Sequence, residues 1–148
     1  MTKNYKVDVL IAGQGAASFA AGLYTSRYQL NTLIVGEHFG GETAIGGLIE
    51  NYPGQPDIDG FDLMLKFKEQ IDNLKTPIHS SNLVNVEKKS GKFYSTLEDG
   101  TQIESISLIL GIGRERRKLG LEMKILGQVR EFHIAQLVML LYIKTNLQ

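Results

Sequence analysis

Cysteine is absent from this chain of 148 residues, tryptophan is also absent, and proline occurs only three times. Without a cysteine, the chain's own side chains can form no disulfide, no thiolate nucleophile and no cysteine-ligated metal centre. The three histidines, His38, His79 and His133, lie far apart and show no metal-ligand spacing. We therefore expect no metal site and interpret these histidines as surface or core residues.

An excess of charge of either sign is missing too, since 16 Lys and Arg balance 16 Asp and Glu. This balance favours neither nucleic acid nor an anionic membrane as a partner. No apolar run approaches the roughly 20 residues needed to span a bilayer. Met1-Thr2-Lys3-Asn4 leads directly into a strand-like segment without a signal-peptide pattern. We expect a single cytoplasmic domain of ordinary size, with neither nucleic acid nor membrane as a partner.

The most informative stretch runs from Asp8 to Ser18. An apolar run leads into Gly13-Gln14-Gly15, and a segment of small residues that begins with Ala16 and Ala17 follows. Strand, tight glycine turn and helix in this order are typical of a nucleotide-binding βαβ unit. The first glycine permits the sharp turn, and the second lets a pyrophosphate approach the backbone and the helix N-terminus. Ser18 stands where a third glycine, which allows close helix–strand packing, is usual.

A second apolar run, Thr32 to Val35, ends at Gly36-Glu37. An acid about 20 residues after the glycines is where a ribose hydroxyl would be bound. Glu37 is therefore the candidate ribose ligand. An ordinary tight turn without a ligand remains the alternative interpretation of the glycines.

The remaining pattern predicts the rest of the fold. We expect a strand at 5–12, helices at 16–29 and 60–75, a strand at 32–36, an irregular loop at 37–59 and a short strand near Ile78. Asp57, Asp59 and Asp62 suit the helix start at residue 60. Period-two segments at 83–86, 92–97 and 102–104, separated by Ser90-Gly91 and Asp99-Gly100, predict an antiparallel meander. Ser107 to Leu110 predicts a buried parallel strand. The fold class is α/β, a Rossmann-type parallel sheet with a β-meander crossover.

Several further segments carry a family resemblance. They are Gly40-Gly41-Glu42, Glu50-Asn51-Tyr52-Pro53-Gly54, Gly111-Ile112-Gly113 and Arg116 to Leu121. Together with the glycine turn, they resemble the FAD domain of the thioredoxin reductases of the low-molecular-weight type. The resemblance runs from about Tyr5 to Glu122. It implies an FAD-binding domain that is incomplete, because in this family the domain's last part follows the NADPH domain in the sequence.

The resemblance also implies roles for individual residues. The FAD pyrophosphate would lie over Gly13, Gly15, Ala16 and Ala17. Glu37 would bind the ribose, although it falls one place beyond the usual strand-end acid because Gly36 occupies that place. The loop residues that would follow the cofactor toward the flavin are Gly40, Gly41 and Glu42, with Asn51 near the isoalloxazine or bracing its own loop. Gly111 and Gly113 match a segment that commonly reads Ala-Thr-Gly, with Ile112 in place of the threonine.

Two departures from the family limit the function that can be expected. Its members carry a Cys-x-x-Cys pair and an NADPH domain, and this chain has neither the cysteines nor a second dinucleotide motif. We therefore expect an FAD-binding fragment that cannot reduce a disulfide alone, with NADPH and thioredoxin as partners only of an intact relative. The alternatives are a non-catalytic nucleotide-binding or interaction module, and a cysteine-free flavin reductase component of the ferredoxin-NADP type.

The tail does not fit the family pattern. We divide the chain into an FAD-binding part at 1–122 and a tail at 123–148 that is helical at 131–147. Back-translated in a frame displaced by two nucleotides, Arg130 to Leu140 can encode Gly-Val-Ser-Tyr-Cys-Ala-Thr-Cys-Asp-Ala, the type of redox segment that the family carries at this point. We therefore expect a frameshifted gene, or a sequencing error, between about Leu121 and Arg130. The incomplete domain leaves apolar surface exposed, so we also expect the chain to bind FAD poorly, to self-associate, or to cover this surface with the segment 131–147.

Overall fold

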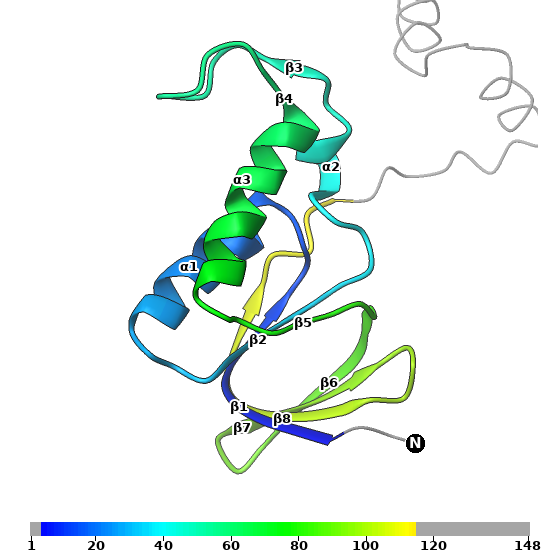
Figure 1. The fold of residues 1–148 in the computed structure, drawn as a ribbon. Helices are drawn as coiled ribbons and strands as arrows, with labels where there is room; N and C mark the ends of the chain where they lie inside the picture. Colours follow the sequence, from blue (N-terminus) through cyan, green and yellow to red (C-terminus); the bar gives the residue numbers. More distant parts are fainter. Residues whose placement is uncertain (1–3, 115–148) are drawn as a thin grey trace, which may run out of the picture. The chain divides into compact units, whose positions relative to one another are not determined.

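The computed structural model describes residues 4–114, and those up to Gly113 form one compact unit. In chain order, the elements are β1 Asn4–Ala12, α1 Ala16–Arg27, β2 Thr32–Val35, α2 Gly41–Ala44, β3 Leu48–Ile49, β4 Ile58–Asp59, α3 Gly60–Asn73, β5 Ile78–His79, β6 Leu83–Lys89, β7 Lys92–Leu97 and β8 Gln102–Leu110 (Figure 1). Among the described residues, no helix is long and apolar enough to cross a membrane.

A six-stranded sheet in the order β5-β2-β1-β8-β7-β6 organises the unit. The strands β5, β2, β1 and β8 run parallel, whereas β6, β7 and β8 form an antiparallel meander. The meander therefore connects β5 to β8 across the sheet, and the predicted Rossmann-type sheet with a β-meander crossover is confirmed.

The two faces of the parallel strands have separate cores. Val9, Ile11 and Ile34 pack with Phe19 of α1 and with Met64 and Ile71 of α3. The opposite core joins Leu10, Ala12, Leu33 and Val35 to Leu97 and Ile103 of the meander. Alternate residues of a strand point to opposite faces, so the unbroken apolar runs of β1 and β2 fit strands covered on both sides.

Helix α1 lies close to the sheet because its residues are small. A Cβ added at Gly22 would lie 2.7 Å from Cδ1 of Ile34. Ser18 is completely buried, and its hydroxyl donates to the carbonyl of Gly111 at 3.2 Å. The serine at the third-glycine position therefore fits the close helix–strand packing and adds a polar link to the end of β8.

Helix α3 begins as the acidic cluster predicts. Asp59 is its N-cap, with a carboxylate oxygen that accepts from the N–H of Phe61 at 2.9 Å, and Asp62 lies in the first turn. Satisfying a free N–H and complementing the helix dipole both stabilise this end of the helix. Asp59 and Asp62 therefore have the structural role expected of them, whereas the role of Asp57 stays a prediction.

Three details of the sequence prediction are wrong. The segment 37–59 is not irregular throughout, since it contains α2 and the antiparallel pair β3–β4. The predicted strands at 102–104 and 107–110 are one strand, β8, because a single backbone pairs with β7 on one side and with β1 on the other. Ser107 to Leu110 is not buried: β7 reaches only Ser105, and Leu110 is 59% exposed.

Candidate functional site

Three glycines meet at the carboxyl ends of β1, β2 and β8. Gly13 donates its N–H to the carbonyl of Val35 at 2.7 Å, and Gly111 donates to Ala12 at 2.8 Å. A Cβ on Gly13 would lie 2.2 Å from the carbonyl oxygen of Gly111, and its φ of +112° disfavours other residues. Gly36 also packs closely, since a Cβ built on it would lie 3.2 Å from the Gly13 carbonyl carbon. These glycines allow the strand ends to pack backbone against backbone.

Gly15 is different, because it is open to the surroundings. It is the N-cap of α1 with an extended backbone (φ −89°), and no side chain caps the helix there. A Cβ built on Gly15 would meet nothing within 4 Å. The first N–H groups of a helix lack partners within the helix and favour a bound anion. The backbone around Gly15, Ala16 and Ala17 is therefore accessible to an anionic ligand.

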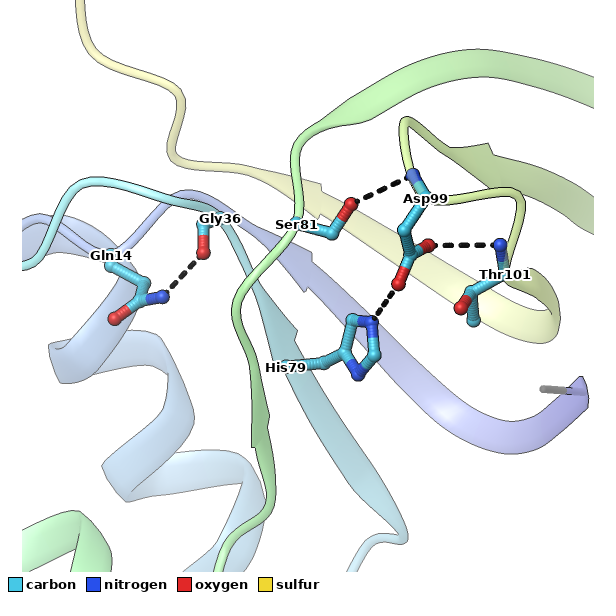
Figure 2. Close-up of polar contacts among 6 residues, drawn as sticks. All are labelled: Gln14, Gly36, His79, Ser81, Asp99 and Thr101. Atoms are coloured by element: carbon cyan, nitrogen blue, oxygen red, sulfur yellow. Dashed lines mark hydrogen bonds and ion pairs between the residues drawn. The ribbon is translucent and has the colours of Figure 1, made fainter. Parts of the chain in front are cut away.

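A second glycine loop lies directly beside the first. Gly40 donates its N–H to the carbonyl of Gln14 at 2.7 Å and forms an isolated parallel bridge with Gly15. A Cβ on Gly41 would point at the Cα of Gly15 from 3.5 Å. The side chain of Gln14 is buried and donates to the carbonyl of Gly36, which fixes the first loop to the end of β2 (Figure 2). The two predicted cofactor loops are thus brought together.

Glu37 is the second residue after β2 and is exposed. Its carboxylate accepts a hydrogen bond from Nδ2 of Asn82 at 2.8 Å, and its backbone N–H donates to Oδ1 of Asn82 at 3.2 Å. A carboxylate has about four acceptor positions, so it can accept further bonds. The acid therefore lies at the strand end in a defined orientation.

A groove of about 620 Å³ adjoins this acid. Gln14 and Glu37 line it beside the aromatic rings of Phe39 and Phe61, whose centroids are 5.6 Å apart. Leu65 and Lys68 of α3 also belong to the lining. Because Phe61 and Leu65 face this groove, they are about half exposed although they belong to an amphipathic helix.

The segment from His79 to Asn82 is held against the turn between β7 and β8. The Asp99 carboxylate contacts Nε2 of His79 at 2.7 Å and accepts from the N–H of Thr101, while Ser81 Oγ accepts from the N–H of Asp99 (Figure 2). The Thr101 backbone bond and the His79 ring lower the pKa of Asp99 to about 2. The Ser81 hydroxyl accepts from a backbone N–H, and the Ser81 backbone N–H itself donates to the carbonyl of His79 at 3.0 Å, so these contacts brace the fold.

The remaining predicted site residues lie at the surface. Glu42 is exposed in the first turn of α2, and Gly113 is exposed with φ +67° just after β8. Asn51 is exposed in the segment between β3 and β4, and none of the contacts above brings it to the glycine loops. The flavin role of Asn51 therefore stays a prediction. His38 is exposed, whereas His133 and the predicted tail at 123–148 lie outside the described residues.

The sequence pattern did not predict a role in the site for the side chains of Gln14, Asn82 or Asp99. Their partners lie 22, 45 and 20 residues away along the chain, which a local pattern does not reveal. The only signal for Gln14 was its position between the two glycines. Within residues 4–114, no three His, Cys, Asp or Glu side chains gather in a way that could hold a metal ion.

Comparison with known proteins identifies relatives. No family model matches the chain. The thioredoxin reductase of Mycoplasma pneumoniae is 35% identical over 122 residues, which are 81% of this chain and 39% of the relative. The resemblance inferred from the sequence is therefore confirmed over about four fifths of the chain, which spans about two fifths of the length of the curated relative.

Solved structures give the same result. Lactococcus lactis thioredoxin reductase has a TM-score of 0.77 at 28% identity, covering 83% of this chain and 41% of that one. A ferredoxin-flavin thioredoxin reductase from Clostridium acetobutylicum has a TM-score of 0.70 at 26% identity, covering 78% and 40%. The described unit therefore has the fold of part of the thioredoxin reductases.

Proposed function

We propose that this chain, whose sequence and fold match part of the thioredoxin reductases over about four fifths of its length, binds FAD at the junction of its two glycine loops. The observation that carries the proposal is the open position at Gly15. Its backbone is unstrained, a Cβ there would meet nothing within 4 Å, and Gly41 lies beside it. Gly15 therefore has no side chain at the place where a phosphate would have to approach the backbone.

The pyrophosphate of FAD would be held by the first turn of α1. Gly13 shapes the turn, and Gly15, Ala16 and Ala17 offer backbone N–H groups and the positive end of the helix dipole. No side chain occupies the N-cap position of this helix. The chain's contribution here is a preformed anion site made of backbone, so it needs no lysine or arginine.

Glu37 would accept hydrogen bonds from the ribose hydroxyls beside Gly36. Gly40, Gly41 and Glu42 would follow the cofactor toward its flavin, with Gly111 and Gly113 along the end of β8 and Asn51 near the isoalloxazine. The packing of Gly13, Gly36 and Gly111 supports these assignments, because it brings three of the predicted positions to one sheet edge.

Bound FAD would supply two-electron transfer, whereas the chain's own residues supply binding and orientation. The chain holds no cysteine, so no thiol pair is present to accept electrons. We infer that it does not reduce a disulfide alone, and that NADPH and thioredoxin concern only an intact relative. A cytoplasmic location is part of the same proposal.

Purified protein tests the function directly. We expect the chain to take up FAD on reconstitution, with flavin absorbance that stays with the protein through gel filtration. A colourless preparation that binds NAD(H) would support a nucleotide-binding module instead. Bleaching by NADPH would support a cysteine-free flavin reductase component. Either result would contradict the proposal of an inactive FAD-binding fragment.

A further inference from the structure

We infer that Asn82 is a positioning residue that sets the Glu37 carboxylate for a ribose diol. This inference rests on the proposed function, because the ribose belongs to FAD. Asn82 lies in the short connection between β5 and β6, which no cofactor motif includes. It contacts Glu37 twice, although 45 residues separate the two in the chain.

The two contacts require one orientation of the amide. Oδ1 accepts the backbone N–H of Glu37 at 3.2 Å, while Nδ2 donates to Oε2 of the same residue at 2.8 Å. Reversing the amide would set an NH₂ against an N–H and an oxygen against a carboxylate. Asn82 therefore fixes both the main chain and the carboxylate of Glu37.

Asn82 is itself held from the other side. Its carbonyl accepts from the N–H of Glu98 at 2.9 Å, and Nδ2 lies 3.5 Å from a Glu98 carboxylate oxygen. The preceding residues are anchored too, since the carbonyl of His79 accepts from the N–H of Gly36 at 3.2 Å. The β7–β8 turn and the end of β2 thus hold the connection from two sides.

The chemistry requires a neutral donor at this position. Asn82 stands between two carboxylates, Glu37 and Glu98, and its amide hydrogens point to both. An aspartate of the same size would keep an acceptor for the Glu37 N–H but would lose the donor and add a third negative charge. A carboxylate held by one donor keeps acceptor positions for the two hydroxyls of a ribose.

The decisive probe is ADP, which carries the adenosine ribose and the pyrophosphate without the flavin. We expect Asn82→Ala to weaken ADP and FAD binding about tenfold, as the loss of an oriented charged hydrogen bond implies, and Asn82→Asp to weaken it at least as much. With 2′,3′-dideoxy-ADP, which lacks both hydroxyls, the variants and the wild type should bind alike. In a Glu37→Ala background, Asn82→Ala should cause no further loss.

Asn85→Ala, an exposed asparagine of β6, is the matched control and should leave ADP affinity unchanged. A merely structural role for Asn82 would weaken dideoxy-ADP as well and would add to the Glu37→Ala effect, and either result overturns the inference. Unchanged ADP affinity in Asn82→Ala overturns it too.

Failure of the proposed function gives a different result from failure of this inference. In that case the wild type binds neither FAD nor ADP, and Asn82 has no ribose role. Side-chain amide NMR of the wild type and Glu37→Ala then shows whether the contact itself exists. An Asn82 resonance unmoved by Glu37→Ala would remove the contact as well as its role.

Discussion

Gly13 and Gly15 of the first loop are in different environments, so a side chain at each would have a different effect. Gly13 has a positive φ, and a Cβ there would collide with the carbonyl of Gly111. Gly15 has an ordinary extended backbone and open space around it, so nothing in the fold demands glycine there. Packing therefore explains the glycine at position 13, whereas the proposed pyrophosphate site would explain the glycine at position 15.

Substitutions at these two positions should separate the two reasons. We expect Gly15→Ala to weaken FAD and Gly15→Val to abolish its retention, because a growing side chain blocks the approach of the pyrophosphate. Circular dichroism should show that both variants keep most of their secondary structure. Gly13→Ala should instead lose stability. Undiminished FAD binding by Gly15→Val would remove the pyrophosphate assignment.

Glu37 offers a second test at the residue scale. Removing one charge-assisted hydrogen bond should cost on the order of 1.5–3 kcal/mol of binding free energy in Glu37→Ala. A titration that follows flavin fluorescence quenching measures this loss. Because Glu37 is exposed, the variant should keep the wild-type melting temperature. An unchanged FAD affinity would show that another group binds the ribose.

At the scale of elements, Asp99 joins the β7–β8 turn to the end of β5. Its pKa is lowered from 3.8 to about 2, by the Thr101 N–H and the His79 ring. A lowered pKa in the folded state means that the charged form stabilises the fold above pH about 4 and that this contribution is lost as the pH falls toward 2. Asp99→Asn should therefore be less stable than the wild type at pH 7.

Urea unfolding at several pH values checks the prediction for Asp99→Asn. The difference in unfolding free energy between the two proteins should narrow between about pH 4 and pH 2, where Asp99 of the wild type becomes neutral. Asp57→Asn, which changes an exposed carboxylate between β3 and β4, is the control. A constant difference across this pH range would mean that the Asp99 charge does not stabilise the fold.

The same elements show what a sequence can reveal. The strand, turn and helix around Gly13 and Gly15 were predictable, because their pattern lies within one short stretch of sequence. The continuity of β8 was not predictable. Ile106 and Ser107 join the two predicted strands into one only because β1 pairs with β8 from Gln102 to Leu110. Asn82 was also missed because its role depends on two contacts made across the sheet end.

At the scale of the whole molecule, one edge of β8 beyond Ser105 has no partner strand among the described residues. Strand β7 pairs with β8 only from Gln102 to Ser105, so the backbone beyond it pairs with β1 alone among the described elements. Ile106 and Leu110 are each more than half exposed there. Unpaired strand edges with apolar side chains favour pairing with another chain. We therefore expect either self-association through this edge or its covering by another segment of the chain.

Deleting residues 128–148 distinguishes these outcomes. If the tail covers the open edge, the shortened chain should form dimers or larger species at concentrations where the full chain is monomeric, and it should melt at a lower temperature.

If the edge pairs between copies, both chains should associate alike, and Ile106→Lys should reduce association because a charge on an edge strand opposes pairing. Analytical ultracentrifugation of the three proteins measures this. A shortened chain that stays monomeric, as stable as the full chain and fully loaded with flavin would show that residues 1–127 are self-sufficient despite the open edge.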